Sequence, residues 1–499
     1  MELQFNKTLC SCLQWPVREV QNQEQTQEIR LSDGMPDIGR VLGAWGQILL
    51  RGKEWHTGSA GMSGGVMVWV LYMPEDGAAI QCVESWLPFQ SKWDFQDPGR
   101  DGTIRISCVL RSVDARSTSA RKLMIRTGIE ILCEAVVPVE KELYSAEDLP
   151  SDVQILRNTY MLNLPREAGE KSFTIDEELT IPTSAPKIEK ILRHELRPEM
   201  IDQKVLAGKA VFRGVGILHI LYAAEDGSLH SWDFEIPFSQ YMELDRDYDQ
   251  NATTNIIPAV TNLELERFED EKLRLKAGIT GQYVIYENSP VMLIADAYSP
   301  HRTVLPECVN LQLPSVLDIS KETIHIEHDL EAEGASVVDV SFSIDNPRLN
   351  RNGDAVQVAL TGTLQTLYYD AEGVLQNSVA RKESVWSIPA EMSCGIHAIA
   401  WPSGKPQVLD SGSRTCLRAD ALVEATTISN SGLQMVTGLE LGEIVDLPLE
   451  RPSVILRKAG RDSLWDIAKK TGSSVDAIMK ANHLQTEADS KQVLLIPVI

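Results

Sequence analysis

Cysteine is scarce in this sequence, with eight residues in a chain of 499. A small secreted scaffold held by disulfides is far denser in cysteine, so this class of protein is excluded. Cys82, Cys108 and Cys133 lie in or beside apolar segments, where buried thiols are common. Cys10 and Cys12 form a C-x-C without the second pair that a zinc site requires. We therefore expect reduced cysteines, most of which are structural.

Long apolar runs are absent as well. The longest fully apolar segment, Val66–Met73, is much shorter than the roughly 20 residues that span a bilayer. The first residues lack the basic region followed by an apolar stretch that marks a signal peptide. We expect a soluble cytoplasmic protein that does not span a membrane.

Positive charge is in deficit, with 47 Lys and Arg against 71 Asp and Glu and a net charge of −24. This balance argues against a nucleic-acid partner, whose phosphates attract Lys and Arg. The deficit is uneven, because residues 454–499 carry a net +2 and the preceding chain −26. We interpret the acidity of the larger part as a means of solubility.

Motifs for catalysis or nucleotide binding are missing or out of context. No G-x-x-x-x-G-K-[ST] loop is present, so we expect no bound ATP and no cofactor. Gly61–Gly65 fits G-x-S-x-G, but a nucleophile elbow needs a strand before the serine and a helix after it. We interpret this segment as a glycine-rich loop that leads into the strand Val66–Met73.

A polar cluster at residues 325–329 offers potential metal ligands, His325, Glu327, His328 and Asp329. The two histidines are three apart rather than the four of a helical zinc motif, and Ile324 and Ile326 alternate with them. This alternation indicates a polar strand edge. We expect no metal site and no enzymatic activity.

An internal repeat organises the first 447 residues. Val70–Gly77 (VLYMPEDG) recurs as Ile220–Gly227 (ILYAAEDG), 150 residues later. Lys122–Ile125 and Lys272–Leu275 have the same offset, and a weaker third copy is Thr366–Gly373. The sequence therefore predicts three similar domains in tandem, 1–158, 159–305 and 306–447, before a tail at 453–499.

Each repeat has the pattern of a mainly β domain. Val66–Met73 suits a central strand covered on both faces, and Glu-Asp-Gly then forms a turn in which glycine takes a positive φ. Apolar and polar residues alternate from Leu123 to Cys133, as in a half-buried strand. We expect a sandwich or an open barrel in each repeat. The apolar spacing at 188–196 adds a minor helix to this prediction.

The tail contains the pattern of two short helices between two strands. Asp462 and Ser463 offer caps for a helix that carries Leu464, Ile467 and Ala468 at helical spacing. Gly472 closes this helix in a left-handed cap, and Ser474 begins the second. Apolar strands at 454–456 and 493–496 complete a βααβ unit.

This tail resembles a LysM module in the run Asp462–Lys470, in Ala481-Asn482 and in Leu495-Ile496-Pro497. The resemblance implies a groove for N-acetylglucosamine polymers, formed by the first loop and the segment after the second helix. The family usually has glycine directly before the aspartate, whereas here Arg461 stands there and Gly460 precedes it. Trp465 is open to two interpretations, core or groove side, and we favour core. For Asn482 we favour a left-handed helix cap over a ligand contact.

The repeated unit, with its Leu-Tyr and Glu-Asp-Gly hairpin, resembles the SPOCS domain of spore-coat proteins. Its order before a LysM resembles the SipL type of coat-assembly protein, with Leu447–Pro452 as the linker. This resemblance implies a non-enzymatic scaffold in the mother-cell cytoplasm, at the forespore surface, whose LysM binds a coat morphogenetic ATPase.

The residues that we expect to form the partner face belong to two segments of the tail, Arg461, Asp462, Ser463, Leu464, Asn482, His483 and Leu484. A guanidinium at Arg461 suits a carboxylate of a protein partner in a two-bond geometry. The alternative is a protein that binds peptidoglycan through the same groove.

Overall fold

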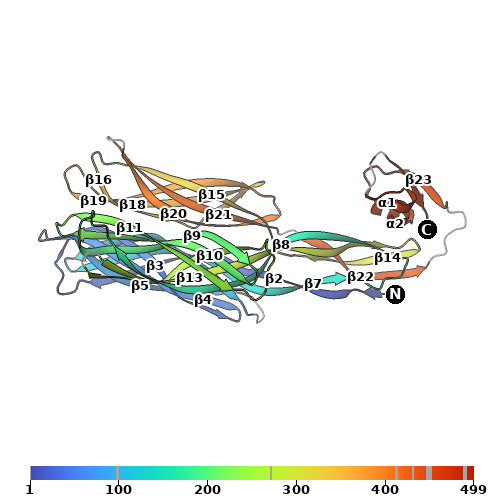
Figure 1. Ribbon diagram of the computed structural model, residues 1–499, viewed down its shortest axis with the longest axis horizontal. Coiled ribbons are helices and arrows are strands. Elements are labelled where there is room, and N and C mark those ends of the chain that lie inside the picture. Colours follow the sequence, from blue (N-terminus) through green and yellow to red (C-terminus); the bar gives the residue numbers. More distant parts are fainter. Residues whose placement is uncertain are drawn as a thin grey trace.

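A computed structural model describes residues 2–96, 101–269, 272–410, 414–429, 432–444, 452–486, 490 and 492–499. Almost all of the regular structure is β, and the two helices lie near the C-terminus. This confirms the predicted fold class. Figure 1 shows an elongated body of long strands, a narrower extension of the same strands, and a small module beside the far end of that extension.

Residues 6–145 form a first unit of two three-stranded antiparallel sheets. One sheet has the order β2-β7-β6 and the other β3-β4-β5. The strands are β2 (Asn6–Arg30), β3 (Ile38–His56), β4 (Ser59–Pro74), β5 (Gln81–Asp94), β6 (Thr103–Ser119) and β7 (Lys122–Ser145). Their facing sides enclose one apolar core, in which Val66, Val68 and Val70 of the central strand β4 are fully buried.

The same strand order recurs in a second unit, with sheets β12-β13-β8 and β11-β10-β9. Its strands are β8 (Gln154–Thr180), β9 (Ile188–Leu206), β10 (Lys209–Ala224), β11 (Leu229–Glu243), β12 (Thr253–Glu269) and β13 (Lys272–Tyr298). The strands β9, β10, β12 and β13 begin 150 residues after β3, β4, β6 and β7.

A third unit has sheets β15-β21-β20 and β16-β18-β17, with β19 paired to β18. The first strand of its meander is divided into β16 and β17. Its strands are β15 (Ser315–Leu330), β16 (Ser336–Ile344), β17 (Arg348–Asn352), β18 (Ala355–Tyr369), β19 (Leu375–Pro389), β20 (Cys394–Asp410) and β21 (Thr415–Ser429). The three domain ranges stay a prediction, because residue 158 lies inside β8 rather than between strands.

Turn glycines mark the same hairpin in each unit. Gly77, Gly227 and Gly373 have φ of 73°, 80° and 78°, which only glycine adopts at low cost. Aspartates brace the turns, since Asp76, Asp226 and Asp370 each accept a nearby backbone N–H. The predicted Glu-Asp-Gly turns are thus confirmed.

Two local predictions were wrong. Residues 188–196 lie in strand β9 rather than in a helix. Gly61–Gly65 lies inside β4 rather than in a loop, so Ser63 is an exposed strand residue with no helix after it. Glycine is required at position 65 because the Trp86 ring occupies the space of a Cβ.

The strands continue beyond the three units into a narrower extension, which we call the stalk (residues 2–14, 137–164, 286–313 and 433–444). Here β2 pairs with β7, β8 with β13, and β14 (Arg302–Leu311) with β22 (Leu433–Ile444). β1 (Glu2–Gln4) borders β22. Side chains of all three pairs share an apolar core, including Cys12, Leu293 and Met435. β13 has 27 residues, so it spans about 90 Å at about 3.4 Å per residue.

A small βααβ module follows the stalk. It consists of β23 (Val454–Lys458), α1 (Leu464–Thr471), α2 (Val475–Ala481) and β24 (Val493–Pro497), as the sequence predicts. β23 and β24 form an antiparallel pair. Residues 447–451 of the predicted linker lie outside the described residues.

All eight cysteines are free thiols, and Cys10, Cys12, Cys133 and Cys394 are buried. Burial raises the pKa of the Cys12 thiol to about 11, so this thiol is protonated at neutral pH. The buried positions agree with the packing role predicted for most of the cysteines, whereas Cys308 is exposed.

Candidate functional site

The helices of the C-terminal module begin and end where the sequence predicts. Ser463 caps α1 and forms a capping box with Asp466, whose backbone N–H donates to the Ser463 hydroxyl at 3.1 Å. Gly472 ends α1 in the left-handed conformation, with φ 65°. The core of the module is formed by Leu464, Ile467, Ala468, Ile478, Leu494 and Ile496.

The first loop keeps the positive φ that this type of loop needs, but one residue early. Gly460 has φ 66°, and its N–H donates to the carbonyl of Ser490. Arg461, in the usual place of the glycine, is exposed. Asp462 pairs with Arg457 at 2.5 Å and with Lys470 at 3.2 Å, so its carboxylate is already engaged within the module.

The second predicted segment, Asn482 to Leu484, is fixed by hydrogen bonds of the Asn482 side-chain amide. Asn482 donates to the carbonyls of Ile478 and Leu495 and accepts the Leu495 N–H, at 2.6–2.8 Å. Asn482 is the C-cap of α2, as the sequence predicts, but its φ is −109° and the left-handed residue is His483, with φ 52°. Only the conformation predicted for Asn482 was wrong. His483 is exposed.

The seven predicted face residues thus divide into three groups. Arg461 and His483 are exposed. Leu464 is 2% exposed and Leu484 packs against the same core, so these two stabilise the module. Asp462, Ser463 and Asn482 have partners within the module and fix the shape of the two segments.

One side of the module is docked on the end of the stalk. Trp465 donates its indole N–H to Asp296 of β13 at 2.8 Å, and Lys469 contacts both oxygens of that carboxylate at 2.8 and 2.6 Å. Tyr298 stacks edge-on against Trp465, with ring centroids 4.8 Å apart, and its hydroxyl donates to the Ser473 carbonyl at 2.9 Å. The module is therefore clamped to the stalk by a small aromatic and ionic contact.

Asp296 is ionised in this contact. Burial works against its charged form, but the hydrogen bonds from Lys469 and Trp465 prevail and hold its pKa below the ordinary value. Trp465 is 8% exposed, which agrees with its interpretation as a core residue, while its N–H points at the stalk.

Sequence reasoning missed the docking residues Asp296, Tyr298 and Lys469. A signal was present, because Asp296 is the one charged residue in the otherwise apolar end of β13, Val291–Tyr298. A lone carboxylate in such a strand demands a partner, but the sequence does not show where that partner lies.

A second side of the module exposes apolar side chains. The outer face of the β23–β24 pair carries Val454 and Leu456 on one strand and Val493 and Leu495 on the other. These residues are 46%, 72%, 60% and 39% exposed. Lys458 alternates onto the same face and borders it with a basic side chain, whereas Arg457 lies on the opposite face and pairs with Asp462.

In the described part of the chain, no group of three or more His, Cys, Asp or Glu is placed to hold a metal ion. His325 lies on the edge strand β15, where it contacts Asp420 at 2.7 Å and Arg418 at 2.9 Å. Within the same residues, neither helix has the length and apolar character to cross a membrane.

Comparison with protein families supports both resemblances. Residues 187–267, from β9 to β12, match the family model described as SipL, SPOCS domain, and residues 461–497 match the LysM domain. Both families are non-catalytic. No curated protein and no solved structure matches this chain.

Proposed function

We propose that this protein is a non-enzymatic scaffold for spore coat assembly, which holds a coat morphogenetic ATPase through its LysM module at the forespore surface. The presence of a SPOCS and a LysM domain links the chain to sporulation. The family resemblance supplies the ATPase and the mother-cell cytoplasm as the partner and the place.

The exposed side of the docked module is the observation that supports a protein as the binding partner. Val454, Leu456, Val493 and Leu495 present an apolar sheet face bordered by Lys458, and Arg461 adds an exposed basic side chain. Apolar side chains and arginine are typical of protein interfaces. The clamp at Asp296 holds the module beside the end of the stalk, away from the body (Figure 1).

The alternative function is binding of peptidoglycan through the LysM groove. The positive φ at Gly460 favours this alternative, because the first loop still has a glycine in the left-handed conformation at its turn. Arg461 opposes it, since a guanidinium contributes little beside a neutral sugar ring and obstructs close approach.

The test is a titration of the full chain with the purified coat ATPase and, separately, with chitooligosaccharide or peptidoglycan fragments. We expect the ATPase to bind, and Arg461→Glu to weaken binding by about 1–3 kcal/mol, the usual scale for a charge-assisted contact. Glycan binding at micromolar strength that survives Arg461→Glu, with no binding of the ATPase, would replace the scaffold by the peptidoglycan-binding function.

A further inference from the structure

A cavity of ≈ 520 Å³ lies where the three units meet. It is bordered by one pair of sheet-edge strands from each unit, β3 and β6, β9 and β12, and β16 and β20. Such a volume falls within the range of about 300–1,000 Å³ typical of small-molecule sites. The cavity is built by all three units together, and no single unit contains it.

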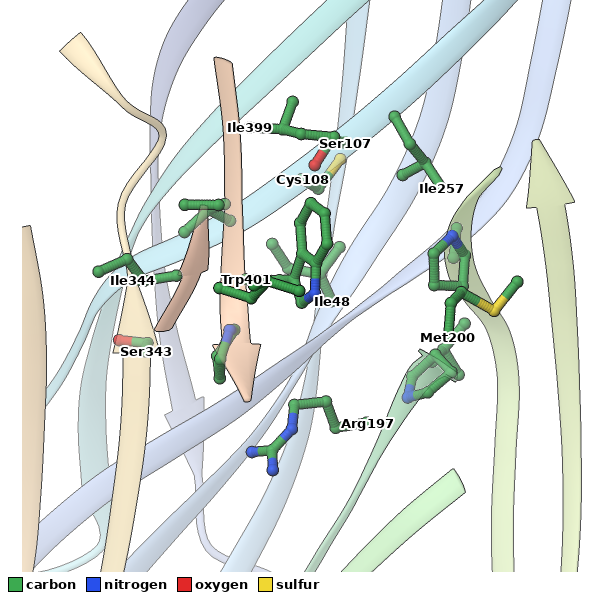
Figure 2. Close-up of a pocket in the computed structure, with 18 of the residues that line it drawn as sticks. Ile48, Ser107, Cys108, Arg197, Met200, Ile257, Ser343, Ile344, Ile399 and Trp401 are labelled. Atoms are coloured by element: carbon green, nitrogen blue, oxygen red, sulfur yellow. The ribbon is translucent and has the colours of Figure 1, made fainter. Parts of the chain in front are cut away.

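The lining is rich in apolar side chains that the protein leaves half-buried. Figure 2 shows the Trp401 indole in the middle of the cavity wall, with Ile48, Ile257, Met200 and Ile399 around it. All five are only partly buried. An apolar occupant would remove this surface from water, at about 25 cal/mol for each Å².

Backbone groups of the bordering strands are satisfied by side-chain amides. Gln47 of β3 both donates to the Leu196 carbonyl and accepts its N–H, at 2.7 and 2.9 Å. Gln282 of β13 does the same for Ile106 of β6, at 2.8 Å for each bond. At Leu196 and Ile106 the backbone groups are therefore occupied, which disfavours a peptide that pairs with the strand edges at these positions.

The charged groups of the lining are engaged within the protein. Lys321 pairs with Glu424 at 2.9 Å, and Arg197 with Glu199 at 3.1 Å. Asp202 pairs with Arg213 at 2.8 Å, and Glu195 lies 3.9 Å from Arg193. An ionic ligand would have to break one of these pairs, so the cavity suits an uncharged molecule.

Polar anchors for such a molecule are also present. The hydroxyls of Ser107 and Ser343 belong to the lining, from β6 and β16 respectively (Figure 2). A hydroxyl both donates and accepts, so each can orient one polar group of an otherwise apolar ligand.

We propose that the cavity between the three units is a binding site for an uncharged, mainly apolar small molecule. The site is separate from the LysM module and from its partner face. Occupancy joins the three units, because the ligand contacts strands of each one. Ligand binding therefore stabilises the arrangement of the units as well as its own site.

The experiment titrates the full chain with Nile red, an uncharged apolar fluorophore, and with the anionic anilinonaphthalene sulfonate. Cys108→Trp fills the cavity from β6, and Cys308→Trp places the same change on exposed β14 of the stalk as its control. Ser343→Phe fills the cavity from β16, with exposed Ser117→Phe on β6 as its control. Circular dichroism and thermal unfolding check each variant for folding.

We expect saturable one-site binding of Nile red, weakened at least about tenfold by each folded filling variant and unchanged by both controls. The anionic dye should bind more weakly than Nile red. If Cys108→Trp does not fold, the comparison of Ser343→Phe with its control Ser117→Phe tests the proposal.

The proposal is overturned if Nile red shows no saturable binding, or if filling variants and controls bind alike. Equal affinity for the anionic dye contradicts the uncharged ligand. Displacement of Nile red by an extended apolar peptide, but not by small apolar competitors such as dodecanol, assigns the cavity to a peptide and also overturns the proposal.

Discussion

The two sides of the LysM module differ in what covers their apolar surface. On the docked side, Trp465 is 8% exposed and has an aromatic neighbour and a carboxylate from the stalk. On the open side, Leu456 is 72% exposed, and its cross-strand neighbour Leu495 is 39% exposed. A module that needed only to fold would have a polar outer sheet face. The docked side fixes the module in place, and we propose that the open side meets a partner.

The largest effect should follow from removing the docked aromatic ring. Trp465→Ala should cost about 3–5 kcal/mol of module stability, because it leaves a cavity in a small core and removes the contact with Tyr298. Hydrogen exchange of the amides in α2 and β24 measures this loss. Trp465→Phe keeps an aromatic ring but loses the N–H bond to Asp296. Its module stability should lie between that of Trp465→Ala and that of the unmodified chain.

A module equally protected in Trp465→Ala and in the unmodified chain would contradict the docked side as the source of its stability. Loss of protection throughout the stalk as well would show that the variant has unfolded more than the module.

Loss of the docking carboxylate comes next. Asp296→Asn should weaken docking by about 1 kcal/mol, since it removes the charge opposite Lys469, which is 44% exposed and screened by solvent. Faster hydrogen exchange at residues 465–473, with α2 unchanged, is the expected signature. Asp176→Asn is the matched control, because Asp176 pairs with Arg274 on the body surface, and it should leave exchange in the module unaltered.

On the open side, Leu456→Asp should leave stability unchanged within about 0.5 kcal/mol, as for most surface substitutions. Its effect should appear in binding, with affinity for the coat ATPase reduced about tenfold or more because a charge enters an apolar contact. Val385→Asp, at a side chain that is 57% exposed on the body, is the control. Identical losses from the two variants would mean that general surface charge, and not this face, governs binding.

The smallest effect near neutral pH concerns Asp296. Its folded pKa is depressed, so its stabilising contribution is fully present above the ordinary carboxyl pKa of about 3.9 and is lost as pH falls through the folded value. Exchange at residues 465–473 should therefore be constant between about pH 7 and pH 5, after correction for intrinsic rates, and should rise at lower pH. If exchange at residues 465–473 rises equally at low pH in Asp296→Asn, another titrating group is responsible for the change.

Local patterns in the sequence predicted much of this fold. Central strand β4, the turn glycine Gly77 and the cap at Gly472 each follow from the preference of one residue or one short run. The strand at 188–196 was missed because β9 carries bulges opposite Leu221–Ala224. These bulges interrupt the alternation of a regular strand, so Ile188 and Leu196 pack in one core and Leu192 in another. The spacing of four between these three apolar residues then imitates a helical period.

The docking contact, the stalk and the central cavity depend on how distant segments assemble. Asp296 and Lys469 are 173 residues apart, and their pairing follows only from the stalk's position beside the module. Likewise, Ile48, Ile257 and Trp401 meet because three units pack together. Single-sequence periodicity describes which face of a strand is buried, but not which other strand buries it.

The most direct test of the two-sided module is hydrogen exchange of the full chain with and without the coat ATPase. The account predicts new protection at 454–458, 461–463 and 493–495, with exchange at 465–473 unchanged because docking persists. New protection confined to α1, with faster exchange in the Asp296–Tyr298 segment, would show that the partner takes the docked side and would contradict the account.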